Sequence, residues 1–393
     1  MISEEKARNT ILQSVRPLPP REIPLSTAVG CFAAQDYFAR VSLPMFDNSA
    51  MDGYAVIASD CRSHARLYVM DEQPAGMDRQ LRLRPGEAIR IFTGAPIPAG
   101  ADAVVMQEDV ERRGNEIVVN VDVDPGEFIR NRGCDLSEGQ KILAKGERIR
   151  ATTLGLLASQ GIVDLMIGGE VRASILSTGD ELAKPGAKLQ PGQIYDSNST
   201  LLTALLLSCG ATLKSSERCR DDRDSLHKAI ERGIRNHVLI IAGGVSVGEH
   251  DLVQEVLREL GAKIDIWRVA IKPGKPFLFA QVNDCFIFGL PGNPVSAFVT
   301  FLQFVRPAIF KMMGAADSLL GLPRIPATLL VDLGNGGARA HYVRGKFEDG
   351  KFAPVGRQES HALFGLSRSN ALLRLEPGAK ISAGTTVMVE MWD

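Results

Sequence analysis

The segment Val238-Leu239-Ile240-Ile241-Ala242-Gly243-Gly244 decides the architecture of the central part of this chain. A short apolar run ends directly in two glycines, which is typical of a buried strand that leads into a tight loop. Further apolar strands alternate with helical stretches around it, and this alternation predicts a mostly parallel sheet with helices on both faces. The expected strands are Ala173–Leu176, Val238–Ile241, Ile264–Ile271, Phe277–Val282 and Cys285–Leu290, and the expected helices are Ser199–Cys209, Ser225–Gly233, Asp251–Leu260 and Val295–Met313.

The regions on both sides of this sheet have a different texture. A helix is predicted over residues 3–15, with Ser3 as its N-cap and acidic residues in its first turn. Residues 39–140 contain short β-type runs between glycines and prolines, and a helix follows over Thr152–Gln160. From residue 319 the β texture returns, with Asp349-Gly350 as a hairpin signal. We therefore expect an α/β protein of several domains.

Composition excludes several classes of partner. The chain has 393 residues, 45% hydrophobic and 23% charged, with a net charge of −1. This balance argues against nucleic acid or a membrane surface as a partner, so any anion site has to be local. No apolar run approaches the ~20 residues of a membrane span and the charged N-terminus is not signal-like, so we expect a cytoplasmic protein. The six cysteines lack metal-ligand spacing, which fits reduced thiols and no structural zinc.

Glycines and carboxylates gather where the predicted strands end. The loops after three strands are Ser177–Leu182, Gly243–Asp251 and Pro291–Ser296, and Arg220-Asp221-Asp222 follows another short strand. Ligands of such sheets bind at this edge. Glycines let backbone N–H groups approach a phosphate there, with help from the N-terminus of the next helix.

The carboxylates of these loops predict a cation. Like charges in one cleft raise each other's pKa unless a cation or lysines intervene. Mg²⁺ is a hard ion that binds carboxylates together with water and phosphate oxygens, so the chemistry indicated is metal-assisted attack at, or exchange around, a phosphoryl group. The alternative is that these residues are solvated helix caps and turn residues. The residues are Asp180, Glu181, Asp221, Asp222, Glu249 and Asp251.

The segment Ile271-Lys272-Pro273-Gly274-Lys275-Pro276 predicts an oxyanion site. Pro-Gly is the signature of a type II turn, which would hold the Cα atoms of Lys272 and Lys275 within about 7 Å of each other, so that the two ammonium groups could converge on one point. Their mutual repulsion, roughly 2 kcal/mol at an effective dielectric near 20, would disappear with a small dianion between them. The alternative is a solvated hairpin tip with two diverging lysines.

Six motifs, in order along the chain, resemble those of a known family. They are Met45–Ala55, Thr93–Pro98, Ser177–Leu182, Gly243–Gly248, Lys272–Pro276 and Leu290–Ser296. Each is weak by itself, but together they are highly specific and cover essentially the whole chain. They resemble the motifs of molybdopterin molybdenumtransferases, which are related to the E domain of gephyrin.

The resemblance implies a domain order. Residues 168–318 would form an αβα molybdopterin-binding-like sheet domain, against which a helix in residues 1–19 packs. Residues 20–38 and 141–167 would form a small linking domain, residues 39–140 an inserted β-rich domain, and residues 319–393 a C-terminal β-barrel-like domain.

The resemblance also implies a reaction. Members of the family take adenylylated molybdopterin, cleave its phosphoanhydride with a divalent metal such as Mg²⁺, release AMP and insert molybdate at the dithiolene. Molybdate would bind at Lys272, Lys275, Pro276, Arg344 and Ser360, and adenylyl-molybdopterin at Gly243, Gly244, Ser246, Pro291, Gly292 and Asn293.

The remaining implied residues are carboxylates and a threonine. Glu181, Asp221 and Asp251 match positions for catalysis and metal binding, and Asp52, Thr93 and Asp135 match catalytic positions on the β-rich domain. In the family the latter face the sheet domain of the other subunit, so a homodimer is implied. Transient contact with the adenylyltransferase of the preceding step is a further implied partnership.

Three positions deserve comparison with the family. Arg268 stands where some relatives carry lysine, which replaces a compact ammonium with a planar fork. Glu359 precedes Ser360 where the family more usually has glycine, and a carboxylate beside an oxyanion site would repel molybdate. For Arg344 the alternative is an arginine on the surface of a strand.

Two other functions stay open at the level of sequence. The adenylyltransferase of the preceding step shares the Gly-Gly-x-Ser and Pro-Gly-Asn-Pro loops, but it needs only the αβα unit. A gephyrin-like scaffold would present a groove to a partner peptide, and nothing in the chain signals such a partner. The choice between molybdate and tungstate is also open, because the two oxyanions are close in size and charge.

Overall fold

The computed structural model describes residues 1–245 and 252–392, and it divides the chain into two compact units. The first is Met1–Gln35 with Ala144–Leu154 and Val163–Asp393, and the second is Asp36–Leu143 with Gly155–Ile162. Each unit has a hydrophobic core of its own. The finer domain boundaries inferred from the sequence stay predictions.

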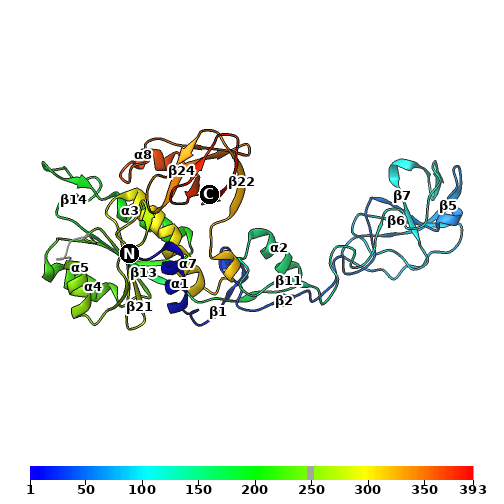
Figure 1. Cartoon of the computed structure of the whole chain (residues 1–393). Coiled ribbons are helices and arrows are strands. Elements are labelled where there is room, and N and C mark those ends of the chain that lie inside the picture. Colours follow the sequence, from blue (N-terminus) through cyan, green and yellow to red (C-terminus); the bar gives the residue numbers. More distant parts are fainter. Residues whose placement is uncertain (246–251, 393) are drawn as a thin grey trace. The chain divides into compact units, whose positions relative to one another are not determined.

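The first unit is built on a six-stranded sheet. In order across the sheet, the strands are β16 (Thr212–Cys219), β13 (Arg172–Thr178), β17 (Val238–Ala242), β21 (Cys285–Leu290), β20 (Leu278–Val282) and β18 (Lys263–Ile266) (Figure 1). Neighbours from β16 to β21 pair in parallel, whereas β20 and β18 pair antiparallel. The predicted mostly parallel sheet is confirmed.

Helices cover both faces of this sheet, because the strands are apolar on both sides. In β17, Val238 and Ile240 belong to one buried cluster, while Leu239 and Ile241 belong to another. The first cluster contains residues of α1 (Glu4–Ser14), α3 (Ser197–Ser208), α6 (Pro294–Thr300), the π-helical segment η4 (Phe301–Val305) and α7 (Arg306–Met312), and the second contains residues of α4 (Arg223–Gly233) and α5 (Leu252–Glu259).

One helical segment of the described chain, Pro294–Met312, is long and apolar enough to cross a membrane, with a mean hydropathy of 1.3. However, 89% of its most apolar window is buried inside the protein. Its apolar character is therefore explained by its place between the sheet and α1.

One predicted strand is wrong. Residues 264–271 were expected to form a single strand, but β18 ends at Ile266 and a separate strand, β19 (Ile271–Lys272), begins five residues later in the sequence. β19 leaves the central sheet and pairs in parallel with β24 (Ala340–Glu348), a strand of the C-terminal region. An apolar run cannot reveal which sheet each half joins, because the partners lie far away in the chain.

The C-terminal region forms a closed barrel. Its strands are β24, β25 (Lys351–Pro354), β22 (Arg324–Leu329), β28 (Thr386–Met391) and β26 (Ala371–Leu375), and β26 pairs back with β24. The hairpin signal is confirmed, since Asp349 and Gly350 join β24 to β25 with φ values of 48° and 73°, as a type I′ turn requires. Beside the barrel lie β23 (Leu333–Gly334), β27 (Lys380–Ile381) and α8 (Leu363–Ser367).

The N-terminal helix α1 is tied to the barrel. Its predicted cap is confirmed, because the Ser3 hydroxyl accepts a hydrogen bond from the Lys6 N–H. Glu4, in its first turn, forms an ion pair of 2.9 Å with Arg374 and accepts a hydrogen bond from the Tyr342 hydroxyl. These contacts hold β24 and β26 against the helical layer of the central sheet.

The second unit is rich in β-structure, as predicted. Its main sheet consists of β7 (Ala103–Met106), β4 (Gly53–Val56), β6 (Glu87–Ile91), β5 (Arg66–Gln73), β9 (Glu116–Val119) and β8 (Val110–Arg113). Two short strand pairs accompany it, β3 (Asn48–Ser49) with β10 (Ile129–Arg130) and β2 (Tyr37–Phe38) with β11 (Lys141–Leu143).

In the first unit β1 (Arg21–Pro24) pairs with β12 (Asp164–Ile167). The helix predicted over Thr152–Gln160 is α2 (Ala151–Ser159), and Gly161 follows it with a φ of +69°.

Candidate active site

The glycine turn after β17 lies against the end of β13. Gly243 and Gly244 have φ values of +89° and +65°, and a Cβ atom at Gly243 would lie 2.6 Å from the Thr178 carbonyl oxygen. Gly292, after β21, approaches Gly243 so closely that its own Cβ would be 3.7 Å from the Gly243 Cα. The ends of these three neighbouring strands therefore meet, and only glycine fits in the first turn.

Two of the predicted carboxylates lie beside this junction. The Thr178 hydroxyl donates a hydrogen bond to the Asp221 carboxylate. The Glu181 carboxylate lies across Gly179, where a Cβ would be 2.7 Å from Oε2. Both carboxylates are exposed and flank Thr178 and Gly179. The structure therefore brings them together at the edge where the parallel strands end, which we call the rim.

Other carboxylates of the rim have local tasks. Asp222 caps α4, accepting hydrogen bonds from the Ser225 N–H at 2.9 Å and from its hydroxyl at 2.8 Å. These bonds lower the pKa of Asp222. Asp180 lies 3.6 Å from Arg220 in an exposed ion pair. For these two residues the cap-and-turn interpretation holds. Ser246, Glu249 and Asp251 lie outside the described residues.

The lysine segment differs from the predicted turn. Residues 272–275 form a bend in which the Lys272–Pro273 peptide bond is cis and Gly274 has a φ of +122°. The segment is not a hairpin tip either, because Lys272 pairs with His341 of β24. Lys272 is exposed, while Lys275 and Pro276 are half-buried. Pairing with the barrel therefore decides the path of this segment, in place of the local turn chemistry.

Arg344 is buried, which contradicts the alternative of a surface arginine. Its side chain is 1% exposed, and its Nε has no hydrogen-bond partner among the described residues. Its guanidinium donates to the carbonyl of Arg357, and Gly365 of α8 packs against it, since a Cβ there would lie 3.4 Å from Nε. Burial lowers the pKa of Arg344. A buried cation with a free donor is suited to an anion.

Ser360 joins the barrel region to the sheet domain. Its hydroxyl accepts a hydrogen bond of 2.9 Å from the Asn293 side chain, and its carbonyl accepts one of 3.1 Å from the Val295 N–H at the start of α6. Asn198 of α3 in turn donates to the Gly292 carbonyl at 2.6 Å. Pro291 is buried behind these residues. The structure thus brings Ser360 to the Pro-Gly-Asn-Pro loop.

In the second unit, Asp52 and Thr93 form a pair. Asp52 Oδ1 accepts hydrogen bonds from the Thr93 N–H at 2.8 Å and from its hydroxyl at 2.7 Å. Both bonds lower the pKa of Asp52 and keep this exposed carboxylate ionised. Asp135 is exposed on another loop, whose backbone pairs with Leu43.

Comparison with known proteins accounts for the chain from end to end. Residues 2–161 match the profile "MoeA N-terminal region (domain I and II)", residues 174–311 match "Probable molybdopterin binding domain" and residues 326–392 match "MoeA C-terminal region (domain IV)". A molybdopterin molybdenumtransferase of Haemophilus influenzae is 36% identical over 99% of this chain and 98% of its own length. The chain belongs to the molybdopterin molybdenumtransferase family.

Two further relatives agree with this membership. A protein of Mycobacterium tuberculosis named molybdopterin molybdenumtransferase 2 is 34% identical over the full length of both chains. The crystal structure of a molybdopterin biosynthesis MoeA protein from Pyrococcus horikoshii superposes with a TM-score of 0.81 at 30% identity, over 100% of this chain and 99% of the other. The predicted multidomain fold is thereby confirmed.

The residues at the rim of this molybdopterin molybdenumtransferase family member suit a hard cation. Glu181 and Asp221 offer exposed carboxylate oxygens, which are the ligands that Mg²⁺ takes. Residues 1–245 and 252–392 contain no group of three or more potential metal ligands. The third ligand expected from the family resemblance, Asp251, is not among them.

Sequence reasoning missed three residues around Arg344. Gln358 accepts a hydrogen bond from the Arg344 N–H at 3.1 Å and donates one to its carbonyl at 3.0 Å. Gly365 provides the space for the guanidinium, and His341 is buried beside Lys272. None carries a local signal, because Gln358 and Gly365 are defined by their contacts with Arg344 of β24, and His341 by the pairing of β24 with β19.

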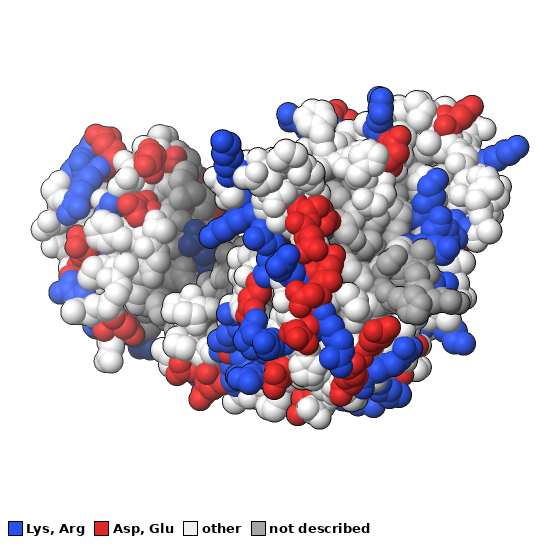
Figure 2. Space-filling view, turned by 90° about the vertical axis from the view of Figure 1, so that its left-hand side faces the viewer, with Lys and Arg blue, Asp and Glu red and all other residues white. Residues whose placement is uncertain are grey.

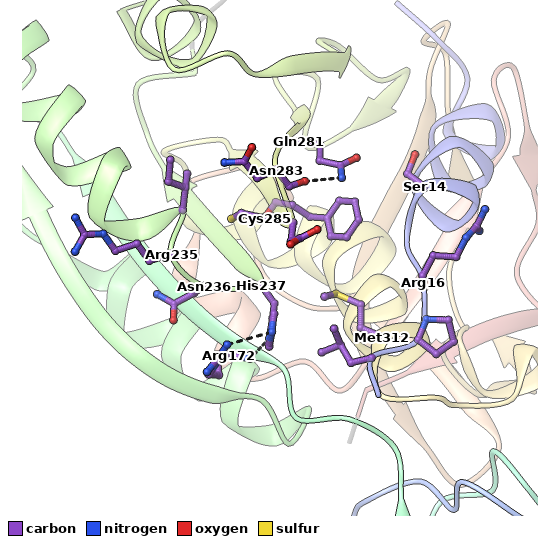
Figure 3. A pocket seen from close by; sticks show the side chains of 15 residues that line it. Ser14, Arg16, Arg172, Arg235, Asn236, His237, Gln281, Asn283, Cys285 and Met312 are labelled. Atoms are coloured by element: carbon purple, nitrogen blue, oxygen red, sulfur yellow. Dashed lines mark hydrogen bonds between the residues drawn. The ribbon is translucent and has the colours of Figure 1, made fainter. Parts of the chain in front are cut away.

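A separate cavity of about 490 Å³ lies at the opposite edge of the central sheet (Figure 3). Arg172, His237 and Cys285, where β13, β17 and β21 begin, are among its lining residues. The backbone N–H of Arg172 donates a hydrogen bond of 3.1 Å to Nδ1 of His237. Because the glycine loops lie at the other ends of these strands, this cavity is not part of the candidate active site.

Charge on the face drawn in Figure 2 is mixed. Figure 2 shows acidic and basic side chains interleaved over the face that it presents. This agrees with the net charge of −1, and it means that attraction for an anion comes from local groups such as Arg344 and Lys272.

Proposed function

We propose that the chain inserts molybdate into adenylylated molybdopterin and releases AMP, with the help of Mg²⁺, as a transferase of molybdenum cofactor biosynthesis. One observation carries the proposal: buried Arg344, whose Nε has no hydrogen-bond partner in residues 1–245 and 252–392, lies in the same region as Ser360, which is bonded to the loop after β21. Arg344, an anion-binding group of the barrel, thus lies in the same region as a loop of the sheet domain that is of the phosphate-binding type. Family membership over the whole chain supports this reading.

The oxyanion is held by Lys272, Lys275, Arg344 and Ser360, with Pro276 shaping the segment. Arg344 provides a planar fork of N–H donors in a site from which water is largely excluded, where charge-assisted hydrogen bonds are strong. The lysines add positive charge near the barrel. Their role is to place molybdate where the dithiolene of the bound molybdopterin can reach it.

The pyrophosphate and pterin are held by the loops of the rim. Gly243 and Gly244 have left-handed backbone conformations, which curve the loop into the kind of concavity that binds phosphate. The Gly243 N–H donates to the Leu290 carbonyl at 3.1 Å, so the Gly244 N–H is the proposed phosphate donor of this turn. Pro291, Gly292 and Asn293 stand at the start of α6, whose N-terminus favours negative charge. Ser246 belongs to the same proposal, although it lies outside the described residues.

Glu181, Asp221 and Asp251 are the proposed metal ligands. Bound Mg²⁺ would neutralise charge on the phosphoanhydride oxygens as AMP leaves. The hydrogen bond from Thr178 fixes the orientation of the Asp221 carboxylate, and Gly179 leaves room for that of Glu181. These contacts position the oxygens before the substrate arrives.

We further infer that the active protein is a homodimer in which Asp52, Thr93 and Asp135 of one copy serve the sheet domain of the other. The ionised Asp52, oriented by Thr93 and exposed, supports this role, because a carboxylate held in this way is suited to contact a bound substrate. A cytoplasmic location is a further proposal, which fractionation of cells expressing the protein would test.

The first experiment measures AMP release from adenylylated molybdopterin by the purified protein at fixed Mg²⁺, with and without molybdate. We expect release that depends on molybdate and yields active cofactor. Repeating it with tungstate measures the preference between the two oxyanions. Synthesis of the adenylylated compound from molybdopterin and ATP would instead identify an adenylyltransferase. Absence of AMP release under all conditions would contradict the proposal.

A further inference from the structure

The segment that follows β25 is wrapped around Arg344. The Gln358 side chain binds both backbone polar groups of Arg344. Its Oε1 accepts a hydrogen bond from the Arg344 N–H at 3.1 Å, and its Nε2 donates one to the Arg344 carbonyl at 3.0 Å. The Arg344 carbonyl also accepts the Val355 N–H at 3.2 Å, and the guanidinium donates to the Arg357 carbonyl. Residues 355–358 are therefore fixed to the strand that carries Arg344.

The next residues are fixed to the sheet domain. Ser360 is bonded to Asn293 through its hydroxyl and to the Val295 N–H through its carbonyl. Glu359 lies between these two anchors, and its own carbonyl accepts the Ala362 N–H at 3.2 Å. The backbone of Glu359 thus has no freedom to move away from the site without breaking hydrogen bonds on one side or the other.

The carboxylate of Glu359 acts electrostatically on the buried guanidinium. Burial lowers the pKa of Arg344, and the Glu359 carboxylate opposes this effect. Glu359 is exposed, so its charge is accessible to solvent and to an incoming ligand. The Arg344 guanidinium therefore has a negatively charged neighbour, Glu359, which directly precedes Ser360 in the chain.

We propose that Glu359 is an affinity-setting residue of the oxyanion site: an exposed carboxylate, carried by a backbone that is fixed between Arg344 and Ser360, that weakens the binding of tetrahedral dianions. This inference rests on the proposed function. Repulsion grows with the product of the two charges, so the carboxylate acts on every dianion. A buried arginine with a free donor would otherwise hold abundant dianions such as sulfate. Glu359 keeps the site exchangeable, so that molybdate can leave it for the dithiolene.

Calorimetric titration of the full-length protein with two tetrahedral oxyanions of different charge tests the inference. Molybdate is a dianion and perrhenate is a monoanion of similar shape. In Glu359→Gln we expect molybdate to bind about tenfold tighter than in the wild type and perrhenate about threefold tighter, because the electrostatic free energy is proportional to the ligand charge. The gain should shrink in 0.5 M salt relative to ~0.05 M, because the carboxylate is exposed.

Glu348→Gln is the matched control, because Glu348 is an exposed carboxylate at the far end of β24 that pairs with Lys346 at 2.8 Å. It should leave both affinities unchanged. Glu359→Ala, which also removes the charge, should reproduce the gain. Equal gains for the two anions, or no gain, would overturn this inference alone. Failure of both the folded wild type and Glu359→Gln to bind either anion would overturn it together with the proposed function.

Discussion

At the scale of single residues, His341 shows how the site controls charge. It is 8% exposed, its Nε2 has no hydrogen-bond partner among the described residues, and it pairs in register with Lys272. Burial, together with the nearby cations Lys272, Arg339 and Arg344, lowers its pKa to about 4. The imidazole is therefore neutral at pH 7, and it adds no positive charge to the proposed oxyanion site.

This makes His341 a source of acid sensitivity. The unfolded chain binds the proton near pH 6.5 and the folded chain only near pH 4, so the associated stability is complete above about pH 6.5 and is lost as the pH falls toward 4. Between these limits the wild type should lose up to about 3 kcal/mol more unfolding free energy than His341→Gln. Urea unfolding at both pH values measures this difference. The exposed His361 gives the control His361→Gln, which should behave as the wild type; equal acid losses in all three proteins would contradict the prediction.

At the scale of elements, the turn after β17 depends on a close approach as well as on a left-handed backbone. Gly243 and Gly261 have φ values of +89° and +79°, but only Gly243 has a neighbour, the Thr178 carbonyl oxygen, within reach of a Cβ. Both Gly→Ala changes should cost about 1 kcal/mol for the backbone conformation. Gly243→Ala should also displace the loop and reduce AMP release at least about tenfold, whereas Gly261→Ala should retain it. Equal activities in the two variants would contradict a role for this loop.

A second element, α1, fastens the barrel. The Glu4 side chain is 13% exposed and that of Arg374 is 29% exposed, and Glu4 also accepts from Tyr342. Glu4→Ala should lower the unfolding free energy by about 2 kcal/mol, because it removes the acceptor of the buried Tyr342 hydroxyl and leaves Arg374 paired only with the exposed Glu376. Glu5, exposed in the same helical turn, provides the control: Glu5→Ala should cost under ~1 kcal/mol. Chemical denaturation of both variants compares them, and similar losses would rule out a special role for Glu4.

At the scale of the whole molecule, the proposed homodimer predicts complementation. Asp52→Asn and Lys275→Met should each be folded and inactive, since one lacks the proposed catalytic carboxylate and the other a proposed oxyanion ligand. If each site combines residues of two copies, random mixing makes half of the dimers mixed, each with one intact site, and restores about one quarter of wild-type activity. The measurement is AMP release after joint refolding. No recovery, despite mixed dimers detected by mass spectrometry, would place both residues in the same copy's site.

Features that depend on neighbouring residues were predictable from the sequence. Ser3 caps α1, Asp349-Gly350 makes the hairpin and the apolar run at 238–241 forms the doubly buried strand β17. Each depends on side-chain periodicity or turn chemistry within a few residues, which a single sequence displays. The six motifs likewise indicated the family that the comparisons support.

Only the tertiary structure decided how the proposed oxyanion site is assembled. β19 leaves the central sheet for β24, so the Lys272 segment forms a bend in place of a type II turn. Arg344 is buried because Gln358 and Gly365 enclose it. These partners are separated from one another by up to about seventy residues in the chain, and their pairing follows from which surfaces can be buried together. The sequence alone therefore determined the elements and the residue types, whereas packing decided which charges lie side by side.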